Sequence, residues 1–515
     1  MRFRLFTAVF LLGFSHFSAR SQTDSLPFSI RLEEATWPEW PGLHSFAHGV
    51  YNERWFMVYG RQGGMHGMIP PDPFPLDEAN QSVRMFDPET GQQWERSIWE
   101  LPDSIAFPLR STNPQFVQQD DRVYVMGGYG KDTTSEDFVT FATLVAIDLP
   151  LLETALESGG DIAPAFRLFR DSLFYLCGGE AELFDSDVVL FGGHEFTGEY
   201  SEIGGIGFTQ RYTNEVRRFH LTDDGADISI SDISITYDSL LFHRRDLNLG
   251  PVRYPDGSEG LAAWSGVFQY DINLPWLSDL YYDGASWTED TLTHLFNHYT
   301  CPLMPLYDSN TADMHTVLFG GISQYYFYEP DSAVYEDLNV PFTDNISCIT
   351  RYADGSTKQV LLPVRFDALW GSNAVFIPAE TVTRYPNEII RLDASEEELL
   401  AGYLFGGIAP EFPNFTPSTA SNKLYKVWLT WTPPEPPLSV KDEIRELEVW
   451  PNPTTGMVFV NIGISWRLTD LTGQLVGAGQ VLDNCIDLKQ IPAGLYLLQV
   501  QDRGGVVFQK ELMVY

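Results

Sequence analysis

The sequence predicts an all-β chain. Short apolar runs that end in glycine recur along most of its length, and turn residues separate them. Aromatic residues are abundant, with 13 Trp, 24 Tyr and 35 Phe among 515 residues, and such side chains favour β-strands. Only residues 149–158 have the pattern of a short helix. A chain of this length exceeds one compact core, so we expect two or three domains.

Residues 1–21 have the pattern of a secretory signal peptide. Arg2 and Arg4 give a basic start, residues 6–14 are mainly apolar, and small residues precede Gln22. The apolar stretch is too short for a permanent membrane-spanning helix, and no other segment approaches the required length. We therefore expect cleavage before Gln22 and a soluble mature protein without a transmembrane segment.

Residues 22–431 repeat a two-part pattern. An apolar run ends at a glycine, and a second apolar run follows after a loop. The six glycines that end the first run are Gly60, Gly127, Gly192, Gly266, Gly320 and Gly406. The second runs lie within residues 82–94, 141–149, 214–225, 277–287, 346–355 and 422–431. Six such units predict a six-bladed β-propeller, in which repeated four-stranded sheets surround a central channel.

Residues 28–32 form one further apolar run before the first repeat. We expect this run to pair with the last blade and close the ring, because closure removes exposed strand edges. The units resemble kelch repeats, in which a glycine pair follows the second strand and an aromatic residue follows the third. Trp94 and Trp287 keep that aromatic position, whereas Gly60 and Gly266 lack the full pair. The resemblance implies a kelch-like propeller similar to the central domain of galactose oxidase. Five or seven blades, or an irregular β-sandwich, are the alternatives.

Residues 432–440 are rich in proline, which favours an extended linker. Residues 441–515 have the pattern of a small β-sandwich: Val458, Val460 and Ile462 alternate along the chain, as do Leu495, Leu497 and Gln499, which fits half-buried strands. Four features follow in order, namely a Pro-Asn-Pro-Thr-Thr-Gly opening, an Asp-x-x-Gly turn, an Ile-Pro-Ala-Gly-Leu-Tyr block and a short final strand.

These features resemble the type A C-terminal sorting domain of proteins exported by the bacterial type IX secretion system. The motif residues are Pro451, Asn452, Pro453, Gly456, Gly473, Gly494 and Tyr496. The resemblance implies an immunoglobulin-like sandwich that engages the secretion machinery. It also implies a secreted or outer cell-surface destination, after signal-peptide cleavage and outer-membrane translocation. The short stretch between Val460 and Trp466 and the Met-Val-Tyr end depart from the family, and an ordinary immunoglobulin-like module is the alternative.

The formal net charge of the chain is −38. Such a charge repels nucleic acid and anionic membranes, so we expect neither as a partner. The cysteines are Cys177, Cys301, Cys348 and Cys485, and none forms the Cys-x-x-Cys spacing of a thiolate metal site. In an exported chain they can pair as disulfides, and the sequence leaves the pairing open, with Cys301 and Cys348 as one candidate pair.

Polar side chains gather upstream of the glycine segments, where we place the start of the innermost strand of each blade. The candidate ligand-binding residues of this channel mouth are His44, Arg110, Arg170, His243, Arg244, Arg245 and His298. In one interpretation they pair with carboxylates or carbonyls and fill the channel together with water. In the other, the arginines bind an anionic ligand such as an acidic sugar.

No metal site or cofactor is predicted. His44 and His48 are four residues apart, as are His294 and His298, but in strands or loops that spacing does not share one face. There is no phosphate-binding, dinucleotide or nucleophile-elbow motif, and no counterpart of the radical site of kelch-like copper oxidases. We therefore expect a glycan- or protein-binding module rather than an enzyme. An enzyme acting on an acidic sugar, of the sialic acid epimerase type, is the alternative, and the sequence leaves catalytic residues, ligand and oligomeric state open.

Overall fold

The computed structural model describes residues 26–67, 74–132, 137–200, 207–290, 292–392, 398–414, 417–431, 449–460, 465–470, 474–482, 484–501 and 507–515. The predicted signal peptide and proline-rich linker lie outside these residues, as does Gly473. Contacts divide the chain into two compact units, Met1–Pro433 and Pro434–Tyr515. In the part of the chain that is described, no helix is long and apolar enough to cross a membrane.

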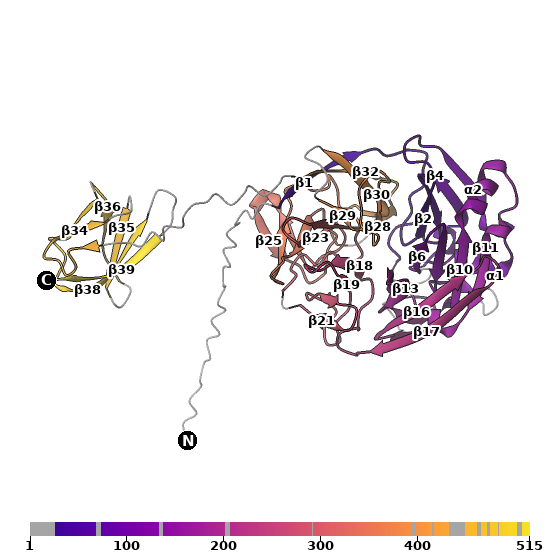
Figure 1. Ribbon diagram of the computed structural model, residues 1–515, viewed down its shortest axis with the longest axis horizontal. Coiled ribbons are helices and arrows are strands. Elements are labelled where there is room, and N and C mark those ends of the chain that lie inside the picture. Colours follow the sequence, from indigo (N-terminus) through magenta and orange to yellow (C-terminus); the bar gives the residue numbers. More distant parts are fainter. Residues whose placement is uncertain are drawn as a thin grey trace, which may run out of the picture. The chain divides into compact units, whose positions relative to one another are not determined.

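The predicted all-β class is confirmed, and the larger unit is built from repeated antiparallel sheets. Five sheets hold four strands that follow one another along the chain. They are β2 (Ala47–Tyr51), β3 (Arg54–Val58), β4 (Ser82–Phe86) and β5 (Gln93–Ser97); β6 (Gln115–Gln119), β7 (Arg122–Met126), β10 (Thr143–Asp148) and β11 (Phe166–Arg170); β12 (Glu180–Phe184), β13 (Asp187–Phe191), β16 (Glu215–Asp223) and β17 (Ile228–Tyr237); β18 (Asn248–Arg253), β19 (Glu259–Trp264), β20 (Leu280–Tyr282) and β21 (Trp287–Glu289); and β22 (Leu303–Asp308), β23 (Asp313–Phe319), β26 (Ile346–Arg351) and β27 (Thr357–Leu361). The sheets follow one another around a common centre, from indigo through magenta to orange (Figure 1).

A sixth sheet joins the two ends of the propeller sequence. Its strands are β28 (Ser372–Pro378), β30 (Leu399–Pro410), β32 (Leu424–Trp431) and β1 (Phe28–Glu34). β1 runs antiparallel to β32, with Phe28 opposite Trp431. The strand expected to close the ring therefore does so, and the outer edge of the last sheet is supplied by the start of the chain.

Each of the six sheets has two consecutive residues with left-handed backbone at its second strand, just after the strand in five sheets and within β30 in the sixth. The pairs are Tyr59 and Gly60, Gly127 and Gly128, Gly192 and Gly193, Ser265 and Gly266, Gly320 and Gly321, and Gly406 and Gly407. Glycine adopts this conformation without the steric cost that a Cβ adds. The predicted glycine segments thus occupy equivalent positions in the six sheets, and Tyr59 and Ser265 adopt the same conformation without being glycine.

These pairs connect each sheet to the next. The N–H of the second residue donates to a carbonyl of the following sheet in five cases: Gly60 to Ser111 (2.8 Å), Gly128 to Leu176 (3.1 Å), Gly193 to Arg244 (2.8 Å), Gly321 to Trp370 (2.9 Å) and Gly407 to Leu43 (2.8 Å). The last of these bonds joins the sixth sheet to the first. The glycine repeat therefore forms a turn and also connects neighbouring blades.

Loops between the strands carry the remaining elements of this unit. The second and third blades contribute an extra sheet of β8 (Tyr129–Asp132), β9 (Asp137–Thr140), β14 (His194–Thr197) and β15 (Thr209–Tyr212). Shorter additions are the hairpin of β24 (Tyr325–Tyr328) and β25 (Ala333–Glu336), strand β31 (Ser418–Ala420) beside β30, and β29 (Ile390–Arg391). β29 pairs in parallel with β22, on the edge that the innermost strand would otherwise leave free.

The predicted helix forms as α2 (Leu149–Ser158). The Asp148 side chain caps it by accepting from the Leu151 N–H at 3.0 Å, and Gly159 ends it in the left-handed conformation. A second helix, α1 (Asp103–Leu109), was not expected, because Pro108 lies inside it and proline usually marks a break.

The smaller unit holds two antiparallel sheets around one apolar core. The first contains β33 (Val449–Trp450), β34 (Met457–Val460) and β37 (Cys485–Asp487), and the second contains β35 (Ser465–Asp470), β36 (Leu475–Gln480), β38 (Gly494–Gln501) and β39 (Val507–Val514). In β38 the buried side chains are those of Tyr496, Leu498 and Val500, so the alternation predicted for Leu495 and Leu497 is correct but the opposite face is buried. The immunoglobulin-like form of this unit stays a prediction.

The candidate disulfide between Cys301 and Cys348 does not form, and all four cysteines are free thiols. Cys348 lies on β26, and β23 separates this strand from β22, which Cys301 precedes. Adjacent strands are about 4.8 Å apart, so positions two strands apart exceed the reach of a disulfide. Burial raises the pKa of Cys177 and of Cys348 to about 12, which keeps both thiols protonated and unreactive.

Replacing Gly127 with alanine should destabilise the propeller much more than the same change at Gly159. The two glycines have φ of 66° and 67°, so both substitutions carry a similar backbone penalty of roughly 1–2 kcal/mol. A Cβ on Gly127 would lie 2.0 Å from the carbonyl oxygen of Leu176, whereas Gly159 has nothing within 4 Å. Thermal unfolding should show the larger fall in Tm for Gly127→Ala. Equal falls would mean that contact between blades does not require glycine.

Candidate functional site

A ring of six residues narrows the channel where the innermost strands begin. Its members all have left-handed backbone, with φ between 50° and 62°, and they are Ser45, Asn113, Gly178, Asp246, Thr300 and Asn373. Main-chain hydrogen bonds make five of the six steps around the ring: Asn113 to Ser45 (3.2 Å), Gly178 to Asn113 (3.0 Å), Asp246 to Gly178 (2.7 Å), Asn373 to Thr300 (2.6 Å) and Ser45 to Asn373 (3.3 Å), each written from N–H to carbonyl. The bond from Ser45 to Asn373 links the first blade to the sixth.

A cavity of about 210 Å³ adjoins this ring, and all six innermost strands contribute to its wall. Its lining combines the ring residues with apolar side chains, among them Phe46, Phe116, Leu249, Leu303 and Phe376. The ionisable side chains in the lining are those of His48, Glu180, Asp246 and Cys301, and none is an arginine or lysine. The cavity is therefore an acidic, partly apolar recess.

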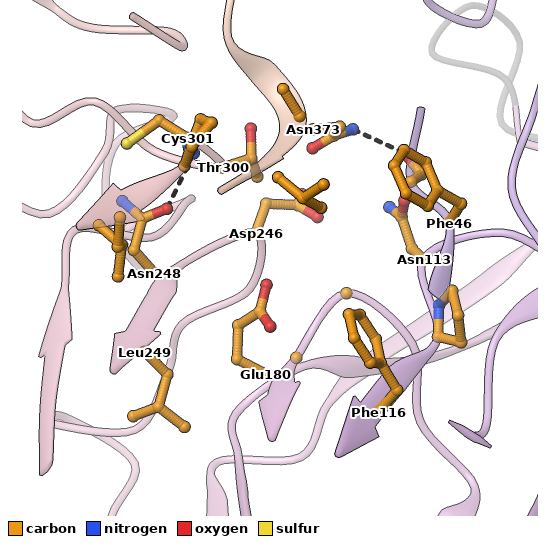
Figure 2. A pocket seen from close by; sticks show the side chains of 18 of the residues that line it. Phe46, Asn113, Phe116, Glu180, Asp246, Asn248, Leu249, Thr300, Cys301 and Asn373 are labelled. Carbon is orange, nitrogen blue, oxygen red and sulfur yellow. Dashed lines mark hydrogen bonds between the residues drawn. The ribbon is translucent and has the colours of Figure 1, made fainter. Parts of the chain in front are cut away.

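Glu180 opens β12, and the backbone before it allows its carboxylate to reach the cavity. A Cβ on Gly178 would lie 3.0 Å from the Asp246 carboxylate, so a side chain at residue 178 would crowd this space. Ala181 and Leu183 pack into the apolar core shared with the second blade, which directs Glu180 and Glu182 to the other face of the strand. Figure 2 shows the Glu180 carboxylate pointing toward Asp246, with Phe116 and Leu249 on either side.

Within the described part of the chain, Glu180 lacks a cationic partner. Among the described residues, no arginine, lysine or histidine forms an ion pair with Glu180 or Glu182. Burial raises the pKa of Glu180 to about 8, with help from the carboxylates of Glu182 and Asp246. Burial likewise raises the pKa of Glu182 to about 8. The folded protein therefore favours the protonated carboxyl groups, and stability should fall as the pH rises from the usual glutamate pKa toward about 8.

The other polar groups of the cavity differ in how far they are already engaged. Asp246 forms an ion pair with Arg245. Burial alone would lower the pKa of the Arg245 guanidinium, but the Asp246 carboxylate raises it. The Asn373 side chain donates to the Ser45 hydroxyl at 2.7 Å. Burial lowers the pKa of His48 to about 4, so the His48 imidazole is neutral at physiological pH. Glu180 is thus the group most available to a ligand.

The structure does not bring the seven predicted channel-mouth residues together in the cavity. None of them lines it. Arg244 is completely buried, and its guanidinium donates to the carbonyls of Leu241, Ser265 and Ser278 at 2.7–3.0 Å. Arg245 is paired with Asp246 and donates to the Tyr212 hydroxyl at 3.0 Å. These two arginines are fully engaged within the protein, as the first of the two interpretations expects.

The remaining five residues are dispersed. His243 is stacked between Tyr212 and Tyr270, with ring centroids 3.9 and 3.7 Å away. His44 and His298 are buried, and burial lowers the pKa of each to about 3. Arg110 ends α1 and lies 5.2 Å from the rings of both Trp99 and Phe107. Arg170 is exposed at the end of β11, the outermost strand of its sheet.

The displacement of these residues from the cavity has a simple cause. The chain passes between two blades before it reaches the ring, and there it accepts the hydrogen bond from the preceding glycine pair, as the Arg244 carbonyl does from Gly193. Side chains one to three residues before the ring therefore pack between blades, and the channel begins only at the ring. The residues predicted from the sequence all precede the ring, whereas Glu180 follows it and was not among them. Its signal was a carboxylate two residues after the Gly178 position, where the other blades carry Ala, Gln, Asn, Pro or Val.

The Pro-Asn-Pro motif of the smaller unit holds the last strand of the chain. The Asn452 side chain donates to the Glu511 carbonyl at 2.7 Å and accepts from the Met513 N–H at 3.0 Å. Pro451 and Pro453 flank this contact. Gly456 accepts from the Leu488 N–H at 2.6 Å, and the Tyr496 hydroxyl donates to the Pro492 carbonyl at 2.8 Å, where Gly494 begins β38. The motif therefore secures the free edge of β39.

Residues 448–514 match the family described as the secretion system C-terminal sorting domain. The chain thus carries a type IX sorting tail, which indicates export to the cell surface or secretion. A solved structure titled "Structure of YjhT" is similar to the chain at 9% sequence identity and a TM-score of 0.42, covering 75% of this chain and 96% of that one. No curated protein matches the chain significantly.

Replacing Arg244 with alanine should destabilise the propeller strongly, whereas Arg170→Ala should not. Loss of the Arg244 guanidinium leaves three buried carbonyls without a donor and opens a cavity beside Trp276, which costs about 3 kcal/mol or more. Arg170 is exposed, so its loss should cost no more than about 0.5 kcal/mol. Urea titrations of both variants measure the difference. A stable Arg244→Ala protein would contradict the structural role.

Proposed function

We propose that this protein is an exported, ligand-binding kelch-like propeller that holds a small neutral or amino sugar in its central channel. The observation that carries the proposal is the unpaired Glu180 carboxyl group inside a cavity to which all six blades contribute. Concave sites that combine apolar walls with a few polar groups are the usual form of a small-molecule site. The channel has this form, whereas the seven polar residues predicted from the sequence do not meet in one site.

The size and chemistry of the cavity define the ligand class. A volume of about 210 Å³ lies below the roughly 300–1,000 Å³ of sites for drug-sized ligands, so the cavity suits one small unit, such as the terminal residue of a glycan. Phe46 and Phe116 offer aromatic surface, and Glu180, Asp246 and Asn113 offer acceptors for hydroxyl or ammonium donors. A sugar hydroxyl or amine can supply both kinds of contact.

The same chemistry weighs against an acidic sugar. A carboxylate ligand would find no arginine or lysine in the lining, and a charge buried without a partner is costly. The alternative of an enzyme acting on an acidic sugar therefore has no support from this cavity. Binding of a neutral or positively charged unit is the function that the site fits better.

Glucosamine, glucose and N-acetylneuraminic acid distinguish these ligand classes in calorimetric titrations. We expect glucosamine to bind most tightly and N-acetylneuraminic acid not to bind. Glu180→Gln should weaken glucosamine binding at least about tenfold, because a bound ammonium group favours the ionised form of Glu180, which glutamine cannot adopt. Glucosamine affinity should also rise with pH below about 8, as Glu180 loses its proton, over the range in which the amine stays charged.

Glu182→Gln provides the matched control. Glu182 lies on the same strand and its pKa is also raised to about 8, but it does not line the cavity. Glucosamine binding should therefore change little in this variant. Equal losses for Glu180→Gln and Glu182→Gln, or tighter binding of the acidic sugar than of glucosamine, would contradict the proposal.

Export should depend on the C-terminal unit, and the propeller should fold without it. We propose that residues 1–21 direct the chain across the inner membrane and that the sorting tail then directs it across the outer membrane. Deleting residues 448–514 should leave a folded propeller in the periplasm, since the two units form separate compact bodies. Fractionation with immunoblotting measures the location. Truncated protein at the cell surface or in the medium would contradict the role of the tail.

A further inference from the structure

The third blade ends in an outer strand unlike those of the other five. β17 (Ile228–Tyr237) is ten residues long, whereas the outer strands β5, β11, β21, β27 and β1 have three to seven. Among the described residues no strand pairs with its outer edge. A long free edge presents a row of unpaired N–H and C=O groups that can bind another strand.

Of the features that protect such an edge, β17 has a bulge at Asp232, where the pairing with β16 shifts register and the backbone is left-handed (φ 52°). The other outer strands are short or carry charged side chains, such as Arg96, Arg170, Glu289, Lys358 and Arg31. β17 contains neither lysine, arginine nor proline, and its one charged residue is Asp232. Protection by charge, proline or shortness is common in natural sheets, and residues 233–237, which follow the bulge, have none of these and leave their edge open to another strand.

One face of this edge is apolar and exposed. Ile233 and Ile235 are 51% and 53% exposed, and Tyr237 is 64% exposed. These three side chains alternate along the strand and therefore share a face. Leu240, which follows in the next turn, is 68% exposed. The stripe continues past the end of the strand and would be covered by apolar side chains of an added strand.

The opposite face of the same edge borders a second cavity. It has a volume of about 330 Å³ and is lined by Ser234 and Thr236 of β17 together with Tyr282 and Trp287 of the fourth blade, and Tyr237 borders it at the end of the strand. The rings of Tyr282 and Trp287 are stacked with centroids 5.1 Å apart. Arg218, at the wall, is engaged by Asp187 at 2.7 Å and by the Tyr282 hydroxyl at 3.2 Å. A side chain of an added strand would find an aromatic pocket here, as in peptide recognition by strand addition.

Charge indicates which partner suits this surface. Asp232 stands exposed in the middle of the strand, and Asp227 and Asp238 flank its ends. A second copy of the chain would bring another such edge and a further net charge of −38, and like charges opposite each other destabilise strand pairs. A segment with a basic side chain opposite Asp232 would instead gain attraction.

We propose that the outer edge of β17 and the adjoining cavity bind an extended polypeptide segment, which adds to the third blade as a fifth strand and carries apolar side chains with a lysine or arginine opposite Asp232. Main-chain hydrogen bonds hold the segment, the Ile233–Ile235 stripe selects the apolar side chains on one face, and side chains on the other face extend toward the cavity. This surface is independent of the central channel.

A synthetic peptide of ten residues that alternates valine with lysine is the probe, matched to the length of β17, and fluorescence anisotropy with the full chain measures its binding. We expect Ile235→Lys and Asp232→Asn each to weaken binding at least about fivefold, through lost apolar contact with added repulsion and through lost attraction. Val334→Lys is the matched control, because Val334 is also β-branched and exposed (44%) on the short strand β25. This control should bind the peptide as the parent protein does.

Two further peptides separate strand addition from general attraction to an acidic protein. A peptide alternating serine with lysine keeps the charge but lacks the apolar side chains, and an N-methylated valine–lysine peptide has lost the N–H groups that would donate the main-chain hydrogen bonds. We expect both to bind at least about tenfold more weakly than the probe. Equal binding of either peptide, an unchanged affinity in Ile235→Lys, or dimerisation of the chain in place of peptide binding would overturn the proposal.

Discussion

The hydrogen bond that the second left-handed residue donates to the next blade, made by five of the six pairs, is the contact on which the propeller depends. It joins Gly60 to Ser111 at the first interface and Gly407 to Leu43 at the last. The backbones approach so closely that a Cβ on Gly127 or Gly320 would lie 2.0 Å from a carbonyl oxygen. Two constraints therefore favour glycine at these positions: the left-handed φ and the lack of space for a Cβ. The strongest repeat in the sequence reflects both.

The same contact decides which side chains reach the channel. Because the residues just before the ring run between two blades, the cations found there, such as Arg244, are held by backbone carbonyls of neighbouring elements. Only after the left-handed ring residue does the chain turn so that side chains of the innermost strand face the channel. An acidic protein thereby keeps its arginines as internal connections between blades and leaves a carboxyl group, Glu180, facing the cavity.

The elements whose signals are local could be predicted from the sequence. The glycine pairs, the third strands, helix α2 and the closing strand β1 each depend on short-range pattern or turn chemistry, and each was found. The innermost strands could not be placed, because the hairpin between them and the glycine pair varies in length. Ser45 precedes Tyr59 by the same interval as Gly178 precedes Gly192, but Asn373 lies much farther from Gly406. Position in the channel is fixed by hydrogen bonds between blades, which no local pattern shows, so Glu180 was missed.

The two sites that we propose share a sign of charge, and the fold explains why. Most basic side chains of the described propeller form ion pairs, for example Arg61 with Glu78, Arg167 with Asp223, Arg245 with Asp246 and Arg351 with Asp290. With few cations and many acids, the carboxylates left without a partner accumulate wherever the fold offers an opening. Glu180 does so in the channel and Asp232 at the edge of β17. Their positions are unrelated by sequence, yet both sites should prefer partners that bring a positive charge, because no arginine or lysine lies in the lining of the channel or along β17.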